Sequence, residues 1–206
     1  MLNNLEFNYL ELKKISLTDL ESATMTLYKA FHNDPCLRYL LYNFYPEREA
    51  KLIHSYVIKT GIKFGYVFSN SEKMEGVAVW LPPESIKISL TQFIRLGGLK
   101  IPIKNILRLN SYDIHAKKIH AQTIKTPHWY LFSIGVDPSM QGKNFGTKLL
   151  APMLEYFDKN KQNCYLETHN RSNIIFYEKN GFKLISTTCL PNSNTEHYSM
   201  LRNYKS

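Results

Sequence analysis

The sequence predicts a single α/β (α+β) domain built around a mixed sheet, and three observations lead to this fold class. The chain has 206 residues, 44% hydrophobic and 21% charged, which is enough apolar material for a packed core. The C-terminal third alternates strand, turn and helix patterns, and a strand hairpin pattern lies upstream of it. No internal repeat interrupts this order. We therefore expect one domain over residues 1–206.

The N-terminal part is typical of two helices followed by a hairpin. Thr18 with Glu21 forms a capping-box pattern, so a helix should begin there and end before the proline that follows residue 34. A second helix is expected from residue 46 to 65, with a proline in its first turn. Residues 65–69 and 76–81 are rich in β-branched and aromatic side chains, which predicts two antiparallel strands.

Residues 84–125 predict a helical insertion. Two helices, over residues 90–96 and 102–122, are expected on either side of a glycine pair. Basic and apolar side chains are interspersed in the second helix, which is typical of a solvated helix face rather than of a surface for nucleic acid.

The C-terminal third gives the clearest pattern. Its strands and helices are separated by turn residues, and Gly181 is placed to end the last helix. The expected elements are a strand at 128–136, a helix opening at 141–146, a strand at 163–168, a helix at 170–180, and strands at 182–189 and 197–201.

Charge alone does not identify a partner. Lys and Arg number 26 against 17 Asp and Glu, a net charge of +9, which suggests an anionic partner such as nucleic acid, a lipid surface or a phosphorylated small molecule. No basic–aromatic repeat supports nucleic acid, and no apolar run reaches the roughly 20 residues that span a bilayer. The first residues lack a basic and an apolar region, so no signal peptide is expected.

The cysteines and histidines predict neither a disulfide framework nor a metal site. Cys36, Cys164 and Cys189 form no CxxC pair, so we expect three reduced, mostly buried thiols in a cytoplasmic protein. His115 and His120 are five residues apart and do not share a helix face, so no metal is expected.

The loop over residues 141–147 is a candidate phosphate site. It joins a strand to a helix and contains two glycines, so several backbone N–H groups are exposed where the helix dipole favours an anion. Lys143 and Lys148 add positive charge nearby. The spacing fits neither the dinucleotide fingerprint nor the Walker loop, and an ordinary strand-to-helix connection has the same composition.

Two segments resemble the GNAT N-acetyltransferases. The run Gln141-Gly142-Lys143-Asn144-Phe145-Gly146, after a strand and Asp137-Pro138, resembles the acetyl-CoA motif Q/R-x-x-G-x-G/A. Residues 170–182 are similar to the segment N-x-x-F-Y-x-x-x-G-F of that family. The strand end Leu166-Glu167-Thr168 is similar to the branch that includes puromycin N-acetyltransferase. The resemblance is specific over residues 128–182.

One position departs from the motif. Asn144 stands where the family has its first glycine, which lets the backbone approach the pyrophosphate. Asn is the non-glycine residue that best tolerates left-handed backbone angles, so we expect the loop to keep its shape.

The resemblance implies a fold, a cofactor and a reaction. The sheet should be mostly antiparallel, with a splayed parallel strand pair and flanking helices. Acetyl-CoA should supply an acetyl group to a primary amine of a small molecule or peptide by direct attack. The implied cofactor-binding residues lie on the strand end, the loop and the following segment: Ile134, Gly135, Val136, Gln141, Gly142, Lys143, Asn144, Phe145, Gly146, Thr147 and Asn173.

The resemblance also suggests catalytic roles. Tyr177 matches the family's proton donor, and Glu167 is the candidate base or binding group for a cationic substrate; His169 and water are the alternative bases. Three further side chains are candidates for the acceptor pocket: Tyr28, Asp34 and Trp80. A non-catalytic module that binds CoA remains an alternative to an enzyme, and either a monomer or a homodimer is compatible with the sequence.

Overall fold

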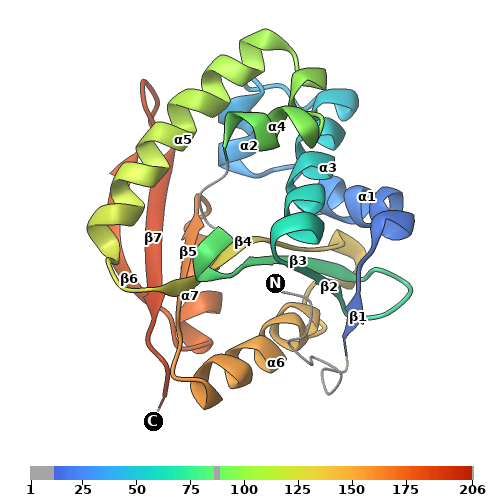
Figure 1. The fold of residues 1–206 in the computed structure, drawn as a ribbon. Helices are drawn as coiled ribbons and strands as arrows, with labels where there is room; N and C mark the ends of the chain where they lie inside the picture. The colour runs from blue at the N-terminus through green and yellow to red at the C-terminus, as the bar shows by residue number, and fades with distance from the viewer. Residues whose placement is uncertain (1–11, 86–88, 206) are drawn as a thin grey trace.

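A seven-stranded sheet forms the centre of the computed structural model, which describes residues 12–85 and 89–205. The strand order is β1-β2-β3-β4-β5-β7-β6, and every neighbouring pair is antiparallel except β4 and β5 (Figure 1). This confirms the predicted mixed, mostly antiparallel sheet. The strands are β1 (Lys13–Lys14), β2 (Tyr66–Ser69), β3 (Gly76–Leu81), β4 (His128–Val136), β5 (Asn163–Thr168), β6 (Lys183–Cys189) and β7 (Glu196–Arg202).

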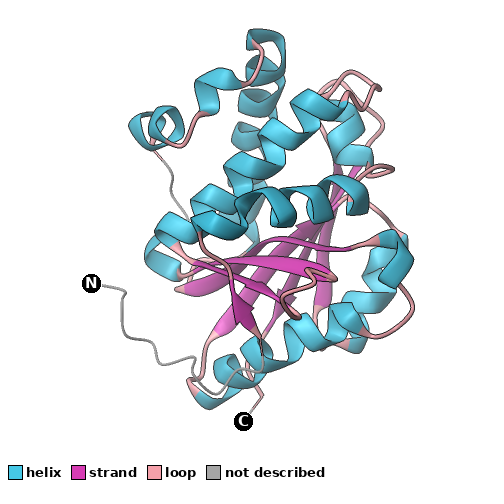
Figure 2. Cartoon of the chain, turned by 90° about the vertical axis from the view of Figure 1, so that its right-hand side faces the viewer, coloured by secondary structure: helices cyan, strands magenta, loops and turns pink. Residues whose placement is uncertain are grey.

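Helices cover both faces of the sheet (Figures 1 and 2). One face carries α6 and α7, and the other carries α1, α3 and the long helix α5, with the short helices α2 and α4 beside them. The bounds are α1 (Leu20–Ala30), α2 (Pro35–Leu40), α3 (Glu47–Phe64), α4 (Leu90–Arg95), α5 (Ile103–Thr123), α6 (Phe145–Lys159) and α7 (Ser172–Lys179). The insertion therefore has the two helices that the sequence predicts.

Each face of the sheet has its own apolar core. Successive residues of a strand point to opposite faces, and β3 is buried along its whole length because helices cover both sides. Trp80 packs with Phe157 of α6, whereas Val79, one residue earlier, packs with Leu27 and Ile58 of α1 and α3.

A β-bulge in the pairing of β4 with β3 coincides with the point where the parallel strands β4 and β5 separate. β4 and β5 pair only from His128 to Leu131, opposite Asn163 to Leu166. On its other edge β4 stays paired with β3 up to Val136, but the register shifts so that Phe132 has no partner. A bulge bends a strand at its extra residue. The bend therefore coincides with the point where β4 leaves β5, and this confirms the predicted splayed pair.

Gly135 allows helix α1 to pack closely on the bent part of β4. A Cβ atom at this position would lie 2.8 Å from the Ala30 Cβ and 3.0 Å from the Leu27 Cδ2. The glycine is thus required by packing against α1, while the backbone of β4 remains available on the edge that faces the gap.

One local prediction near the N-terminus was wrong, and one short helix was missed. The first turn is capped by Ser16, whose backbone N–H donates to the Asp19 carboxylate at 2.9 Å, and not by Thr18 with Glu21. The sequence Asp34-Pro35 does not only end a helix but begins α2, because Asp34 accepts a hydrogen bond from the Leu37 N–H at 2.9 Å. The segment examined for a signal peptide, residues 1–11, lies outside the described residues.

The cysteines are free, as predicted: Cys36 and Cys164 are buried and Cys189 is exposed. Over residues 12–85 and 89–205, no helix is both long and apolar enough to cross a membrane.

We predict that Gly135→Val lowers the free energy of unfolding by about 1–3 kcal/mol, because the added atoms overlap with Ala30 and Leu27. Chemical denaturation of the variant and the parent protein measures the difference. Equal free energies of unfolding would show that α1 does not require the close approach.

Candidate active site

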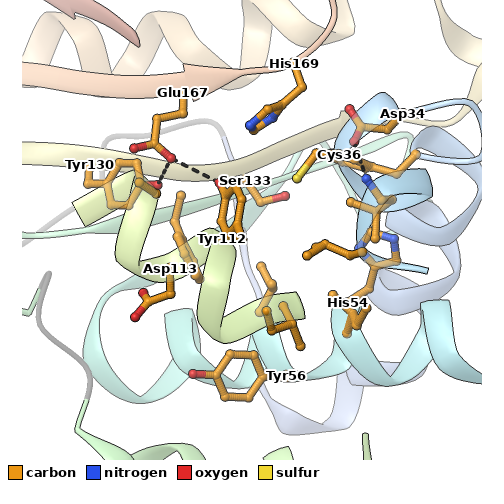
Figure 3. Close-up of a pocket in the computed structure, with 18 of the residues that line it drawn as sticks. Asp34, Cys36, His54, Tyr56, Tyr112, Asp113, Tyr130, Ser133, Glu167 and His169 are labelled. Atoms are coloured by element: carbon orange, nitrogen blue, oxygen red, sulfur yellow. Dashed lines mark hydrogen bonds between the residues drawn. The ribbon is translucent and has the colours of Figure 1, made fainter. Parts of the chain in front are cut away.

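A cavity of about 490 Å³ lies where β4 and β5 separate. Its floor comes from residues 130–134 of β4 and 167–169 at the end of β5, and its walls come from α2, α3, α4, α5 and α7 (Figure 3). Six of the candidate residues line it: Asp34, Ile134, Glu167, His169, Asn173 and Tyr177. The structure therefore brings together side chains that are up to 143 positions apart, between Asp34 and Tyr177.

Glu167 is held by three tyrosines that come from three different elements, two of which, Tyr112 and Tyr130, are labelled in Figure 3. Tyr112 of α5 and Tyr130 of β4 each donate a hydrogen bond to Glu167 Oε2 at 3.1 Å. Tyr165 of β5 donates to Glu167 Oε1 at 2.9 Å. The side chain of Glu167 is only 3% exposed. A buried carboxylate with three phenolic donors is a fixed group with a defined orientation.

The environment of Glu167 has opposite effects on its pKa. Burial raises the pKa above the ordinary value of 4.5, because a buried charge loses its hydration. The hydrogen bonds from Tyr165, Tyr130 and Tyr112 favour the ionised form and oppose part of that rise. The result is a carboxylate with a raised pKa, which is a better proton acceptor than an ordinary surface glutamate.

The histidines beside Glu167 are neutral. His169 Nε2 lies 3.0 Å from His197 Nδ1, and His197 Nε2 lies 3.8 Å from Glu167 Oε1. Burial, with added repulsion from His197 and His115, lowers the pKa of His169 to about 3. Burial lowers the pKa of His197 to about 4. His169 is therefore a weaker candidate base than Glu167.

Asp34 and Tyr177 also line the cavity. Burial raises the pKa of Asp34 to about 6, while its hydrogen bonds to backbone N–H groups of α2 act in the other direction. Burial raises the pKa of Tyr177 above its ordinary value of 10, and the negative charge of Asp34 adds to the shift. Tyr177 therefore stays protonated at neutral pH and can donate a proton.

Asn144 adopts the left-handed conformation that its position requires. Its φ is 64° and its ψ is 11°, and it is the residue directly before the first turn of α6. Gly142 also has a positive φ, of 75°, and a Cβ there would meet no atom within 4 Å. The expectation that Asn144 preserves the loop shape is thus confirmed.

Side chains from two directions fix this loop. Asn70, in the turn between β2 and β3, donates to the carbonyl of Phe145 at 3.1 Å. Gln141 donates through its side-chain amide to the carbonyl of Val136 at 3.1 Å. Gly146 lets α6 start beside α7, because a Cβ there would lie 3.1 Å from the Phe176 ring.

The fixed loop has the properties of an anion site. The first amide N–H groups of a helix have no partner within it and carry a partial positive charge. Residues 141–144, Thr147 and Lys148 are exposed, so the loop, the first turn of α6 and the two lysines lie at the surface. Phosphate groups fit this donor set.

Two candidate substrate residues do not line the cavity. Trp80 is fully buried on the opposite face of the sheet, where its ring packs on Phe157. The alternation of side chains along β3 places it there. Tyr28 stacks on Tyr45, with 5.3 Å between ring centroids, in the core between α1 and α3. Both predictions were wrong because the sequence did not define which face each residue occupies.

Sequence reasoning missed the three tyrosines around Glu167. Tyr130 and Tyr165 are direct partners in the β4–β5 register, and Glu167 follows Tyr165 by two residues, so all three share one face. The alternation of side chains along β4 and β5 could therefore have predicted the contacts of Tyr130 and Tyr165 with Glu167. No sequence pattern predicts the contact of Tyr112, because it forms only when α5 packs on the sheet.

The described part of the chain contains no group of three or more His, Cys, Asp or Glu side chains arranged to hold a metal ion.

Comparisons with known proteins agree with this geometry. Residues 109–182 match the family model described as the acetyltransferase (GNAT) family. A Schizosaccharomyces pombe protein named an uncharacterized N-acetyltransferase is 26% identical over 181 residues, which is 82% of this chain and 73% of that protein.

Solved structures share the fold. A structure of histone acetyltransferase HPA2 and related acetyltransferase from Corynebacterium glutamicum superposes with a TM-score of 0.66 at 18% identity, covering 95% of this chain and 96% of that one. The polyamine N-acetyltransferase of Drosophila melanogaster has a TM-score of 0.61 at 15% identity, covering 93% and 98%. Together the family match over residues 109–182 and the S. pombe relative support an acyl-CoA-dependent N-acetyltransferase, and the solved structures support the fold.

We predict that Asn144→Val destabilises the protein by about 1–2 kcal/mol, because a β-branched residue is strained at positive φ. Asn144→Gly, the matched variant, should stay within about 1 kcal/mol of the parent protein. Thermal and chemical unfolding measure both. Equal losses in the two variants would contradict the role assigned to the left-handed backbone.

Proposed function

We propose that this protein transfers an acetyl group from acetyl-CoA to a primary amine of a small molecule or peptide. The observation that carries the proposal is the position of Glu167. The buried Glu167 carboxylate, whose pKa is raised, lines the same cavity as the part of β4 that has no partner in β5. After residues 137–140, β4 is followed by the loop that we propose binds the phosphate groups. The separation of β4 from β5 thus gives a cofactor access to the β4 backbone and gives an amine access to the Glu167 carboxylate.

The strand end and the loop would hold the cofactor. Backbone groups of Ile134, Gly135 and Val136 on the edge away from β3 have no β5 partner, so they can pair with the amides of the pantetheine arm. The N–H groups of residues 141–147 would bind the pyrophosphate, as the fixed shape of the loop supports. Bound there, acetyl-CoA supplies the activated acetyl thioester.

Asn173 is suited to hold the arm between these two places. Its side-chain amide donates to Thr168 Oγ1 at 3.2 Å, and the residue lines the cavity beside the gap between β4 and β5.

Glu167 would prepare the amine. An ammonium group entering the cavity meets this carboxylate and is attracted to it, and Glu167 then removes one proton so that the nitrogen lone pair becomes free to attack. The three phenols keep the carboxylate oriented during this step, and the raised pKa favours proton acceptance.

Tyr177 would complete the reaction as proton donor. The sulfur that leaves the acetyl group carries negative charge, and a phenol that stays protonated at neutral pH can donate to it. Tyr177 is buried on α7 and lines the cavity, so its phenol is available to a thioester bound there.

Two finer assignments belong to this proposal. The strand end Tyr165-Leu166-Glu167-Thr168 supports placement in the branch that includes puromycin N-acetyltransferase. The free cysteines support a cytoplasmic location, where thiols stay reduced.

Glu167→Gln should lower kcat/KM for a primary amine by about 100-fold or more, because an amide does not accept the proton. In the parent protein kcat/KM should rise with pH through the pKa of Glu167, which burial places above 4.5, since only the ionised form acts as a base. This rise of kcat/KM on the acidic side of the pH profile, its acidic limb, should vanish in the variant. Steady-state rates of CoA thiol release across pH measure both effects.

Two controls make this result specific. Glu178→Gln removes an exposed carboxylate from α7 and should leave the rate unchanged. Asp34→Asn keeps the helix cap, since Asn caps as well as Asp, but removes the second carboxylate of the cavity. If Asp34→Asn abolishes the acidic limb and Glu167→Gln does not, Asp34 is the base.

Tyr177→Phe should reduce kcat by about 10- to 100-fold with little change in KM, because it removes a proton donor and keeps the ring packing against Phe182. Single-turnover rates with bound acetyl-CoA measure the chemical step. An unchanged rate would assign the proton transfer to water or to another group.

Calorimetric titration with acetyl-CoA distinguishes an enzyme from a non-catalytic member of the fold. Binding together with turnover of an amine supports the proposal. Binding without turnover of any amine in a broad panel would identify a CoA-binding module.

A further inference from the structure

We propose that the acceptor is a compact amine with a single ammonium group on an apolar body. This inference rests on the proposed function and specifies the substrate class of the same cavity. Three properties of the cavity support this inference: the negative charge of its lining, the apolar wall away from Glu167, and its enclosure by α4 and α5.

The charge in the cavity is negative. Glu167, Asp34 and Asp113 line it, and Lys117 is the single Lys or Arg among the described lining residues. Lys117 is bound to Asp113 at 2.6 Å, and both side chains are about half exposed at the outer end. Burial lowers the pKa of the other basic groups in the lining, His54, His120 and His169, to about 3, 4 and 3, so they carry no charge. A cationic ligand therefore fits better than an anionic or a neutral one.

One ammonium group is enough to balance this site. Asp34 already receives a backbone hydrogen bond as the cap of α2, which compensates part of its charge. Glu167 has only neutral partners, the three phenols. Its charge is thus the one that a ligand must neutralise.

The wall away from Glu167 is apolar. Side chains from α2, α3 and α5 form it, together with a ring from α4: Leu37, Leu40, Ile53, Ile106, Leu109 and Phe93. On α5, Ile106 precedes Tyr112 by six residues, which corresponds to about 9 Å along a helix. Both residues line the cavity, so it extends roughly this far along α5 from the phenol that binds Glu167, and an amine with a chain of about six carbons is a suitable probe.

The enclosure of the cavity disfavours peptides and polyamines. A volume of about 490 Å³ falls in the range of roughly 300–1,000 Å³ that holds small ligands. A peptide would bring backbone N–H and C=O groups against the apolar wall, where they would lose hydrogen bonds to water and find no partner. A second ammonium group would lose its hydration, and the two remaining carboxylates of the lining are already engaged: Asp34 caps α2 and Asp113 pairs with Lys117.

Hexylamine and 1,6-diaminohexane form a matched pair for the test. They have the same carbon chain and differ in one terminal ammonium group. We expect kcat/KM for hexylamine to exceed that for 1,6-diaminohexane by about 10-fold or more, and that for a short alanyl peptide by at least as much. CoA thiol release with saturating acetyl-CoA measures all three.

Ile106→Asp should reverse this preference. The new carboxylate would pair with the distal ammonium group of the diamine and would lose hydration against the alkyl chain of hexylamine, so the ratio should fall by about 10-fold or more. Ile114→Asp is the matched control on the same helix, because Ile114 is 61% exposed and does not line the cavity. It should leave the ratio unchanged.

The outcomes separate this inference from the proposed function. If acetyl-CoA binds and no amine is acetylated, the proposed function fails. If the parent protein acetylates the diamine or the peptide as fast as hexylamine, the function stands and the monoamine class is wrong. The comparison of substrates on the parent protein is decisive even if Ile106→Asp does not fold.

Discussion

The burial of the Glu167 carboxylate is the constraint on which the arrangement of the site depends. An isolated charge inside a protein is strongly unfavourable, so it must receive hydrogen bonds or lose its charge. Here β4, β5 and α5 each supply one phenol, and the three hydrogen bonds support the ionised form. The phenol from α5 also links the helical insertion to the sheet. The insertion is thus part of the site and not only a cover over it.

A single extra residue in β4 gives this carboxylate access to a substrate. Phe132 is left unpaired by the register shift against β3, and the strand bends away from β5 after Leu131. The bend opens the cavity beside Glu167 and frees the backbone edge of β4 as far as Val136. The loop that follows, fixed by Asn70 and by the left-handed Asn144, continues the same path to the helix terminus of α6. One local irregularity thereby lets the unpaired edge of β4 and the proposed base line the same cavity.

Local sequence signals were sufficient for much of this structure. Periodicity and turn residues predicted most helices and strands, and the tolerance of Asn for positive φ predicted the loop at residue 144. The errors came from information that local patterns do not contain. Asp34-Pro35 signals both the end of one helix and the start of another, and the face occupied by Trp80 depends on how the sheet is covered. The contact from Tyr112 to Glu167 spans 55 residues and arises only when α5 packs on the sheet.

The pKa of Glu167 tests the central claim most directly. Carbon NMR of the side-chain carboxyl, labelled with ¹³C and assigned by comparison with Glu167→Gln, follows its ionisation across pH. The account predicts a titration above the ordinary value of 4.5, and a further rise in Tyr112→Phe, because that variant loses a hydrogen bond to the ionised form. A carboxyl that titrates at or below 4.5 and does not respond to Tyr112→Phe would contradict it.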